Sequence, residues 1–172
     1  MDSIYTYTVP LFIKHLGGIR NSLDKAQAYA VDRKVEETVL LSDRLAPDMF
    51  PYVRQVQIAC DNAKGAVARL AGIEAPKFDD TEKTIAELQA RIDKTLAFIS
   101  SVPESGFASA AEQKITLPYF PGKYMTGFDY AREYVIPNFL FHVTVAYAIL
   151  RHQGVPLGKA DFMNGMPLKD LA

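Results

Sequence analysis

Residues 128–154 read FDYAREYVIPNFLFHVTVAYAILRHQG, and the spacing of their apolar side chains predicts a long helix. Alternating steps of four and three residues place one set of side chains on a single face of this helix: Val135, Phe139, His142, Ala146 and Ile149. Pro137 predicts a bend or a restart, because proline removes one intrahelical hydrogen bond and its ring clashes with the preceding turn. We therefore expect a final helical segment that is interrupted near Pro137 and runs to Gly154.

Three earlier segments repeat the same apolar spacing and predict three more helices, at residues 9–30, 53–70 and 85–102. Their buried faces are almost wholly apolar. The Gly17-Gly18 pair lies inside the first segment and weakens it, since each glycine costs about 1 kcal/mol of helix stability relative to alanine. We expect packing against the rest of the protein to hold this segment, or another part of the backbone to pass close to it.

Between the third and fourth helices, two short runs flank a Pro-Tyr-Phe-Pro-Gly sequence, at 114–117 and 123–126. This arrangement predicts a small β-hairpin or an ordered loop. Four helices with narrow apolar seams and so few strands favour an all-α four-helix bundle. A chain of 172 residues fits a single domain, so we assign residues 1–172 to one helical bundle.

The composition indicates which kinds of binding partner and which cellular compartment to expect. The formal net charge is −1, which gives no indication of a nucleic-acid or membrane partner. Cys60 is the only cysteine, so an internal disulfide and a Cys-rich zinc site are excluded. The opening residues lack the pattern of a secretory signal, and the apolar run 134–150 is too short and too interrupted for a confident membrane span. We expect a cytoplasmic enzyme or binding protein.

The buried face of the fourth helix differs from the others because it carries an imidazole, His142. Asn138 lies one turn before His142 on the same face. Gln57, Asp61 and Lys64 follow one flank of the second helix, and buried polar groups need such partners. The pattern predicts a small polar pocket between the second and fourth helices. Two plainer interpretations stay open: a core His142 bonded to a neighbour, and a solvated Asp61–Lys64 ion pair.

Several stretches resemble an uncharacterised bacterial branch, a domain of unknown function, of the DinB/YfiT-like superfamily. They are 44–61 (RLAPDMFPYVRQVQIACD), 69–72 (RLAG) and 137–156 (PNFLFHVTVAYAILRHQGVP). The resemblance covers the chain from about Tyr5 to Asp161. It implies a four-helix bundle with up-down-down-up order, frequent homodimerisation and a site between helices.

Better-studied relatives in this superfamily look like metal-dependent enzymes that use low-molecular-weight thiols. They bind a divalent metal through one histidine on the second helix and a His-x-x-x-His pair on the fourth. The resemblance places His142 at the second position of that pair and Asn138 at the first, and there is no histidine near residues 57–61. A neutral amide is a poor ligand for zinc or nickel. We expect no cofactor, with a weak divalent metal site at His142, Asn138 and Asp61 as an alternative.

Three hypotheses for function follow. The first is a dimeric protein with a structural role or a small polar ligand, in which the metal site of the superfamily is degraded. The second is a metal-dependent thiol transferase or hydrolase that uses His142 as a ligand. The third is a metal-free enzyme in which His142 is a general base oriented by Asp61. The sequence contains none of the common phosphate-binding or nucleophile motifs, so it leaves open whether the protein is an enzyme.

Overall fold

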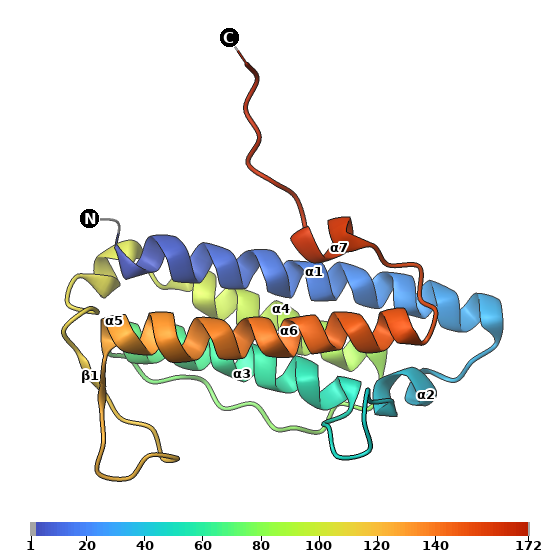
Figure 1. Ribbon diagram of the computed structural model, residues 1–172, viewed down its shortest axis with the longest axis horizontal. Helices are drawn as coiled ribbons and strands as arrows, with labels where there is room; N and C mark the ends of the chain where they lie inside the picture. Colours follow the sequence, from blue (N-terminus) through green and yellow to red (C-terminus); the bar gives the residue numbers. More distant parts are fainter. Residues whose placement is uncertain (1–2, 172) are drawn as a thin grey trace.

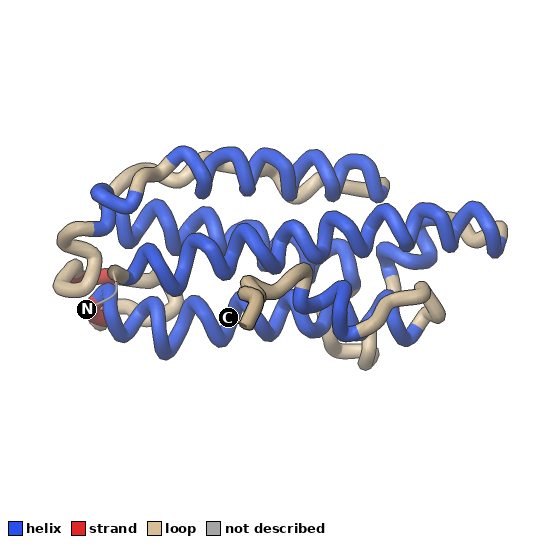
Figure 2. The backbone as a smooth tube through the Cα atoms, turned by 90° about the horizontal axis from the view of Figure 1, so that it is seen from above, coloured by secondary structure: helices blue, strands red, loops and turns tan. Residues whose placement is uncertain are grey.

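The computed structural model describes residues 3–171 and shows a four-helix bundle (Figure 1). The long helices are α1 (Ile4–Arg33), α3 (Tyr52–Ala71), α4 (Ile85–Ser101) and α6 (Ile136–His152). Helices α1 and α6 run in one direction, and α3 and α4 run in the other (Figure 1). The predicted all-α bundle and its up-down-down-up order are confirmed. Viewed from above, the long helices lie side by side and α1 extends beyond the rest at its C-terminal end (Figure 2).

Short elements connect and cover the bundle: α2 (Glu37–Ser42), the 3-10 helix η1 (Glu104–Phe107), β1 (Lys114–Ile115), β2 (Met125–Thr126), α5 (Gly127–Asp129), the π-helix η2 (Tyr130–Val135) and α7 (Lys159–Met163). Strands β1 and β2 pair antiparallel, with Lys114 opposite Thr126 and Ile115 opposite Met125. The small hairpin predicted between the third and fourth long helices is therefore present.

The interruption expected near Pro137 takes the form of a π-helical turn. Helices α5, η2 and α6 follow one another without a gap, and η2 ends at Val135, two residues before Pro137. A proline in a regular α-helix clashes with the carbonyl one turn earlier. The wider π-helical spacing directly before Pro137 relieves that clash, so the chain continues as one helix instead of ending and restarting.

Helix α7 packs on α1 at the glycine pair. A Cβ atom at Gly18 would lie 3.1 Å from the backbone oxygen of Asp161, and one at Gly17 would lie 3.0 Å from Nδ2 of Asn164. Asn164 Nδ2 also donates to the backbone oxygen of Lys14 at 2.8 Å. The close backbone approach that the glycine pair predicted is therefore observed, and α7 supplies it.

The stretch Gly127–His152 is long and apolar enough to cross a membrane, judged by length and composition alone. The core helix of a soluble protein has the same properties. In this structure 44% of the most apolar window of the stretch is buried inside the bundle. The arrangement is consistent with a soluble protein.

A long crossover, residues 72–84, joins α3 to α4. The two helices are parallel, so the crossover returns along the length of the bundle (Figure 1). Arg91 of α4 holds it in place. The guanidinium lies 2.9 Å from carboxylate oxygens of Asp61, Asp80 and Glu82, and it donates to the backbone oxygen of Asp79 at 3.1 Å. Arg91 is only 2% exposed, so one buried cation links α4, α3 and the crossover.

We predict that Arg91→Met lowers the free energy of unfolding by about 3 kcal/mol, because removal of one partner leaves partly buried charges uncompensated. Urea denaturation measures this change. Arg20→Met is the matched control, since Arg20 also contacts two carboxylates, Asp24 and Asp93, but is partly exposed. The free energy of unfolding of this control should fall by less than about 1 kcal/mol. Equal losses in the two variants would contradict a special role for Arg91.

Candidate functional site

His142 points into the interface between α3 and α6 and is 8% exposed. Its Nδ1 atom lies 2.7 Å from Oε1 of Gln55. The amide nitrogen of Gln55 donates to the backbone oxygen of Phe50 at 2.9 Å, so the amide oxygen faces the imidazole. That oxygen can only accept, and Nδ1 of His142 must therefore donate. This hydrogen-bond network assigns the tautomer and leaves the lone pair of the neutral ring on Nε2.

Two effects keep the imidazole neutral. Burial lowers the pKa of His142 below its usual 6.5, and the positive charge of nearby Arg54 lowers the pKa further. Gln55 carries no negative charge that would stabilise an imidazolium. At neutral pH His142 therefore presents one hydrogen-bond acceptor, Nε2, held in a fixed orientation.

Two more polar pairs join α3 to α6 and to η2, the π-helix that continues into α6. Asn138 Nδ2 donates to Oδ1 of Asn62 at 3.0 Å, and Arg69 Nη1 donates to the hydroxyl of Tyr130 at 3.2 Å. Gln55, Asn62 and Arg69 are spaced by seven residues, which is two turns of α3, so they share one face. We call the three pairs, Gln55–His142, Asn62–Asn138 and Arg69–Tyr130, the α3–α6 polar ladder.

The other predicted site residues face elsewhere. Asp61 Oδ1 lies 2.9 Å from Arg91 Nη2 and 3.1 Å from Lys64 Nζ. Gln57 donates to Glu82 of the crossover at 2.8 Å. At 3.6 residues per turn these three residues lie about 180–240° around α3 from Gln55. The single pocket predicted from Gln57, Asp61, Lys64, Asn138 and His142 is thus divided into two groups, one against α4 and one against α6.

Gln55 and Asn62 are the partners that the sequence analysis missed. The proposal that Asp61 orients His142 is corrected, because Gln55 makes that contact and Asp61 binds Arg91. The signal in the sequence was the seven-residue spacing of polar side chains at 55, 62 and 69 inside an otherwise apolar pattern. Such a spacing marks a polar line along one side of a packed helix.

The residues present do not fit a divalent metal. A firm site needs several converging imidazole, thiolate or carboxylate donors. Within residues 3–171 no group of three or more His, Cys, Asp or Glu side chains is placed to hold an ion. His142 and Asn138 each have a side-chain partner on α3, and Asp61 is turned to the other side of that helix. The expectation that the protein takes no cofactor stays a prediction.

Comparison with known proteins agrees with this architecture. A family model described as a domain of unknown function, DUF1993, matches residues 4–163. The chain belongs to this family. A crystal structure of a DinB family member protein from Shewanella denitrificans superposes with a TM-score of 0.94 at 49% sequence identity, and the match covers 97% of this chain and 95% of that one. No curated protein shows significant similarity to this DUF1993 chain. The resemblance to the DinB-like proteins is confirmed.

We predict that the stability of the protein falls as the pH drops from about 7.5 to about 5.5. A histidine with a lower pKa in the folded state takes up its proton more readily when unfolded, so protonation favours unfolding below about 6.5. Burial lowers the pKa of His142 and also that of His15, which lies under α7. Urea denaturation at several pH values measures the decline.

The loss of stability with falling pH should be less steep in His142→Gln than in the natural chain. It should be less steep again in the double variant His142→Gln with His15→Gln. The range stays above pH 5.5 so that carboxylate titration contributes little. A decline of the same steepness in the double variant would show that these two rings are not its source.

Proposed function

We propose that this DUF1993 protein is a dimeric, metal-independent protein that binds a small polar ligand at the Gln55–His142 and Asn62–Asn138 pairs of the α3–α6 polar ladder. One observation carries the proposal: Gln55 holds His142 as a neutral ring with its Nε2 acceptor free, at the position where relatives in the superfamily are expected to bind metal. An acceptor that is fixed but has no charge suits hydrogen bonding to a neutral ligand. Cation binding would instead require further donors.

The second pair of the ladder adds to this site. Asn138 and Asn62 lie next along the ladder from His142 and are only half-buried, so this part of the interface reaches solvent. The amide nitrogen of Asn62 is buried and has no partner within residues 3–171. A ligand that carries both a donor and an acceptor would satisfy His142 and the amides together.

The two enzyme hypotheses have less support. A metal-dependent transferase needs donors that converge, and His142, Asn138 and Asp61 do not. A general base works best when a neighbouring carboxylate stabilises the imidazolium that forms, and the neighbour of His142 is a neutral amide. Binding without catalysis therefore fits the contacts of His142 best.

NMR titration tests the binding proposal. Long-range ¹H–¹⁵N spectra of His142 should show a proton on Nδ1, and millimolar small amides or polyols should shift Nε2 and the side chain of Asn138. Zinc ions should leave these signals unchanged. Stoichiometric zinc binding that is lost in His142→Ala would overturn the proposal and favour the metal-dependent alternative.

A gain-of-function variant is the matched control for this experiment. Asn138→His together with Gln55→His would place two further imidazoles beside His142, which approaches the donor set expected of the metal-binding relatives. This double variant should bind zinc, whereas the natural chain should not. If neither amides nor polyols shift His142, the ligand-binding proposal fails even where zinc binding is absent.

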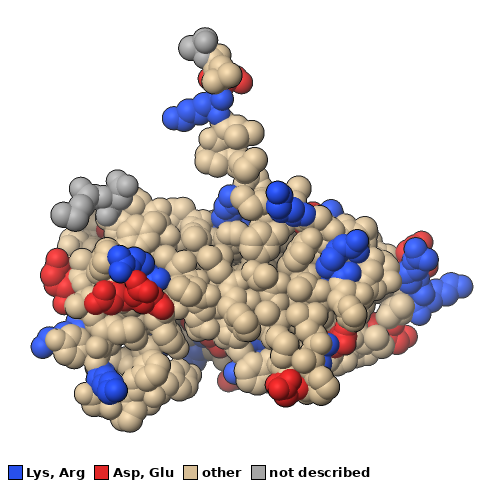
Figure 3. Space-filling view, in the orientation of Figure 1, with Lys and Arg blue, Asp and Glu red and all other residues tan. Residues whose placement is uncertain are grey.

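The outer face of α6 supports the proposed homodimer. No Lys, Arg, Asp or Glu occurs between Glu133 and Arg151. Phe141 is 55% exposed on this face. A broad uncharged area covers the middle of α6 in the space-filling view (Figure 3). Continuous uncharged surface of this kind is typical of a protein–protein interface.

We predict that Phe141→Glu converts the dimer into a monomer, because a carboxylate in an apolar interface loses its hydration without gaining a partner. Light scattering coupled to size-exclusion chromatography measures the mass. Val31→Glu is the matched control, since Val31 is an exposed apolar residue at the far end of α1. A natural chain that is monomeric at micromolar concentration would contradict the prediction.

A further inference from the structure

The hairpin loop, residues 116–124, extends away from the bundle at the end where α3 finishes (Figure 1). Together with Arg69 of α3 it lines a cavity of about 550 Å³ that is open to solvent, and Leu117 is the one buried residue in its lining. Apolar walls come from Leu117, Phe120 and Tyr124, and the charged side chains in the lining are Arg69 and Lys123. No acidic residue lines the cavity, so its net charge is positive.

Neither cation is neutralised nearby. Arg69 and Lys123 take part in no ion pair within residues 3–171. The hydrogen bond that Arg69 makes through its side chain goes from Nη1 to the hydroxyl of Tyr130, a neutral group. The Nε and Nη2 side of the guanidinium is left for another acceptor. Two unpaired cations beside an apolar wall favour a ligand that is itself amphipathic.

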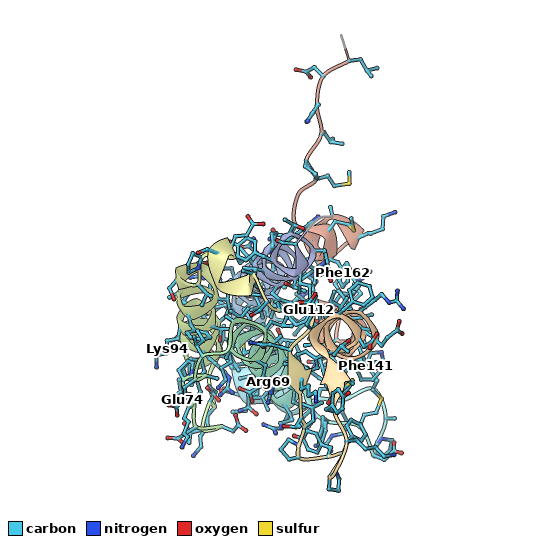
Figure 4. The ribbon with its side chains drawn as sticks, turned by 90° about the vertical axis from the view of Figure 1, so that its left-hand side faces the viewer. Arg69, Glu74, Lys94, Glu112, Phe141 and Phe162 are labelled. Atoms are coloured by element: carbon cyan, nitrogen blue, oxygen red, sulfur yellow. The ribbon has the colours of Figure 1, made fainter. Side chains whose placement is uncertain are left out.

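Gly65 and Tyr130 orient the guanidinium of Arg69, which is itself an exposed residue. A Cβ atom at Gly65 would lie 2.6 Å from Nη1 of Arg69, so the absence of a side chain at Gly65 lets the guanidinium fold back along α3. Tyr130 is 1% exposed and stacks on Tyr134 with ring centres 5.9 Å apart. Viewed from this end of the bundle, Arg69 lies on α3 beside the base of the hairpin (Figure 4).

The hairpin is anchored to the same aromatic pair. The ring of Phe120 packs edge-on against the ring of Tyr134, with ring centres 6.2 Å apart. Within the hairpin itself, Lys114 Nζ lies 5.0 Å from the ring centre of Tyr124. The apolar wall and the guanidinium therefore share one support, Tyr130 stacked on Tyr134. Arg69 is fourteen residues from Gln55, which is about 21 Å along the helix, so this cavity is separate from the His142 site.

We propose that this cavity binds a small organic carboxylate with an aromatic or acyl body. Arg69 binds the carboxylate through its planar fork, and Lys123 adds a second positive charge. The apolar body packs against Leu117, Phe120 and Tyr124. The volume lies within the range of small-molecule sites. The proposal does not depend on the function assigned to His142.

Fluorescence titration with 2-naphthoate tests the proposal, since the chain has no tryptophan to interfere with the signal. Naphthoate should bind, and 2-naphthamide, which is neutral but has the same ring, should bind much more weakly. Arg69→Gln and Lys123→Gln should each weaken naphthoate binding by about tenfold, the effect of losing a charge-assisted hydrogen bond. Circular dichroism checks that each variant is folded.

Gly65→Ala tests the position of the guanidinium separately from its charge. The variant keeps every charge, but its methyl group displaces the guanidinium of Arg69 from Tyr130. It should weaken naphthoate binding while helix content is maintained. Arg132→Gln is the matched control: Arg132 lies at the same end of the protein, paired with Glu133, and does not line the cavity. It should leave the binding of naphthoate unchanged.

Three results would overturn the proposal: equal binding of naphthoate and naphthamide, unchanged naphthoate binding in both Arg69→Gln and Lys123→Gln, or displacement of naphthoate by inorganic phosphate at equal concentration. Displacement by phosphate would show that the site binds anions in general and gains no affinity from the apolar part of the ligand. His142→Phe should not affect naphthoate binding, so a failure here is distinguishable from a failure of the proposed function.

Discussion

The buried guanidinium of Arg91 is the constraint on which the arrangement of α3 depends. Parallel α3 and α4 require a crossover as long as the bundle, and most of it has no regular secondary structure of its own. Backbone groups in such a segment need partners. Arg91 supplies one at Asp79 and draws the carboxylates of Asp80 and Glu82 inward. One side of α3 is thereby covered, and the side toward α6 becomes the place where a binding site can form.

The two sides of α3 consequently carry different chemistry. The side toward α4 and the crossover carries charge, and its acids and bases neutralise each other within one cluster. The side toward α6 carries neutral amides and ends at Arg69, whose charge is not neutralised in the same way. A helix periodicity of 3.6 residues separates these groups although they are neighbours in sequence: Asp61 and Asn62 are adjacent and face different helices.

This separation explains what the sequence could and could not predict. Apolar periodicity located the four long helices, because burial of one face dominates their formation. It also placed His142 inside the bundle. It did not locate the crossover, whose path depends on long-range ion pairs to Arg91, so the predicted pocket wrongly grouped Asp61 and Lys64 with His142. The alternative interpretation, an Asp61–Lys64 ion pair, is the contact that the structure shows. Gln55 was missed because the seven-residue spacing marks a polar face of the helix but does not identify a partner 87 residues away.

The amides that pair across this interface also have an energetic consequence inside the bundle. A metal centre satisfies all its ligands through one ion, whereas buried amides must find partners individually. His142 with Gln55 and Asn138 with Asn62 achieve this in pairs, but the amide nitrogen of Asn62 remains without a partner in the described chain. An unsatisfied buried group costs about 1–3 kcal/mol. An oxygen atom of a bound ligand at Asn62 would recover that free energy on binding, which is a physical reason for a polar ligand at this position of the ladder.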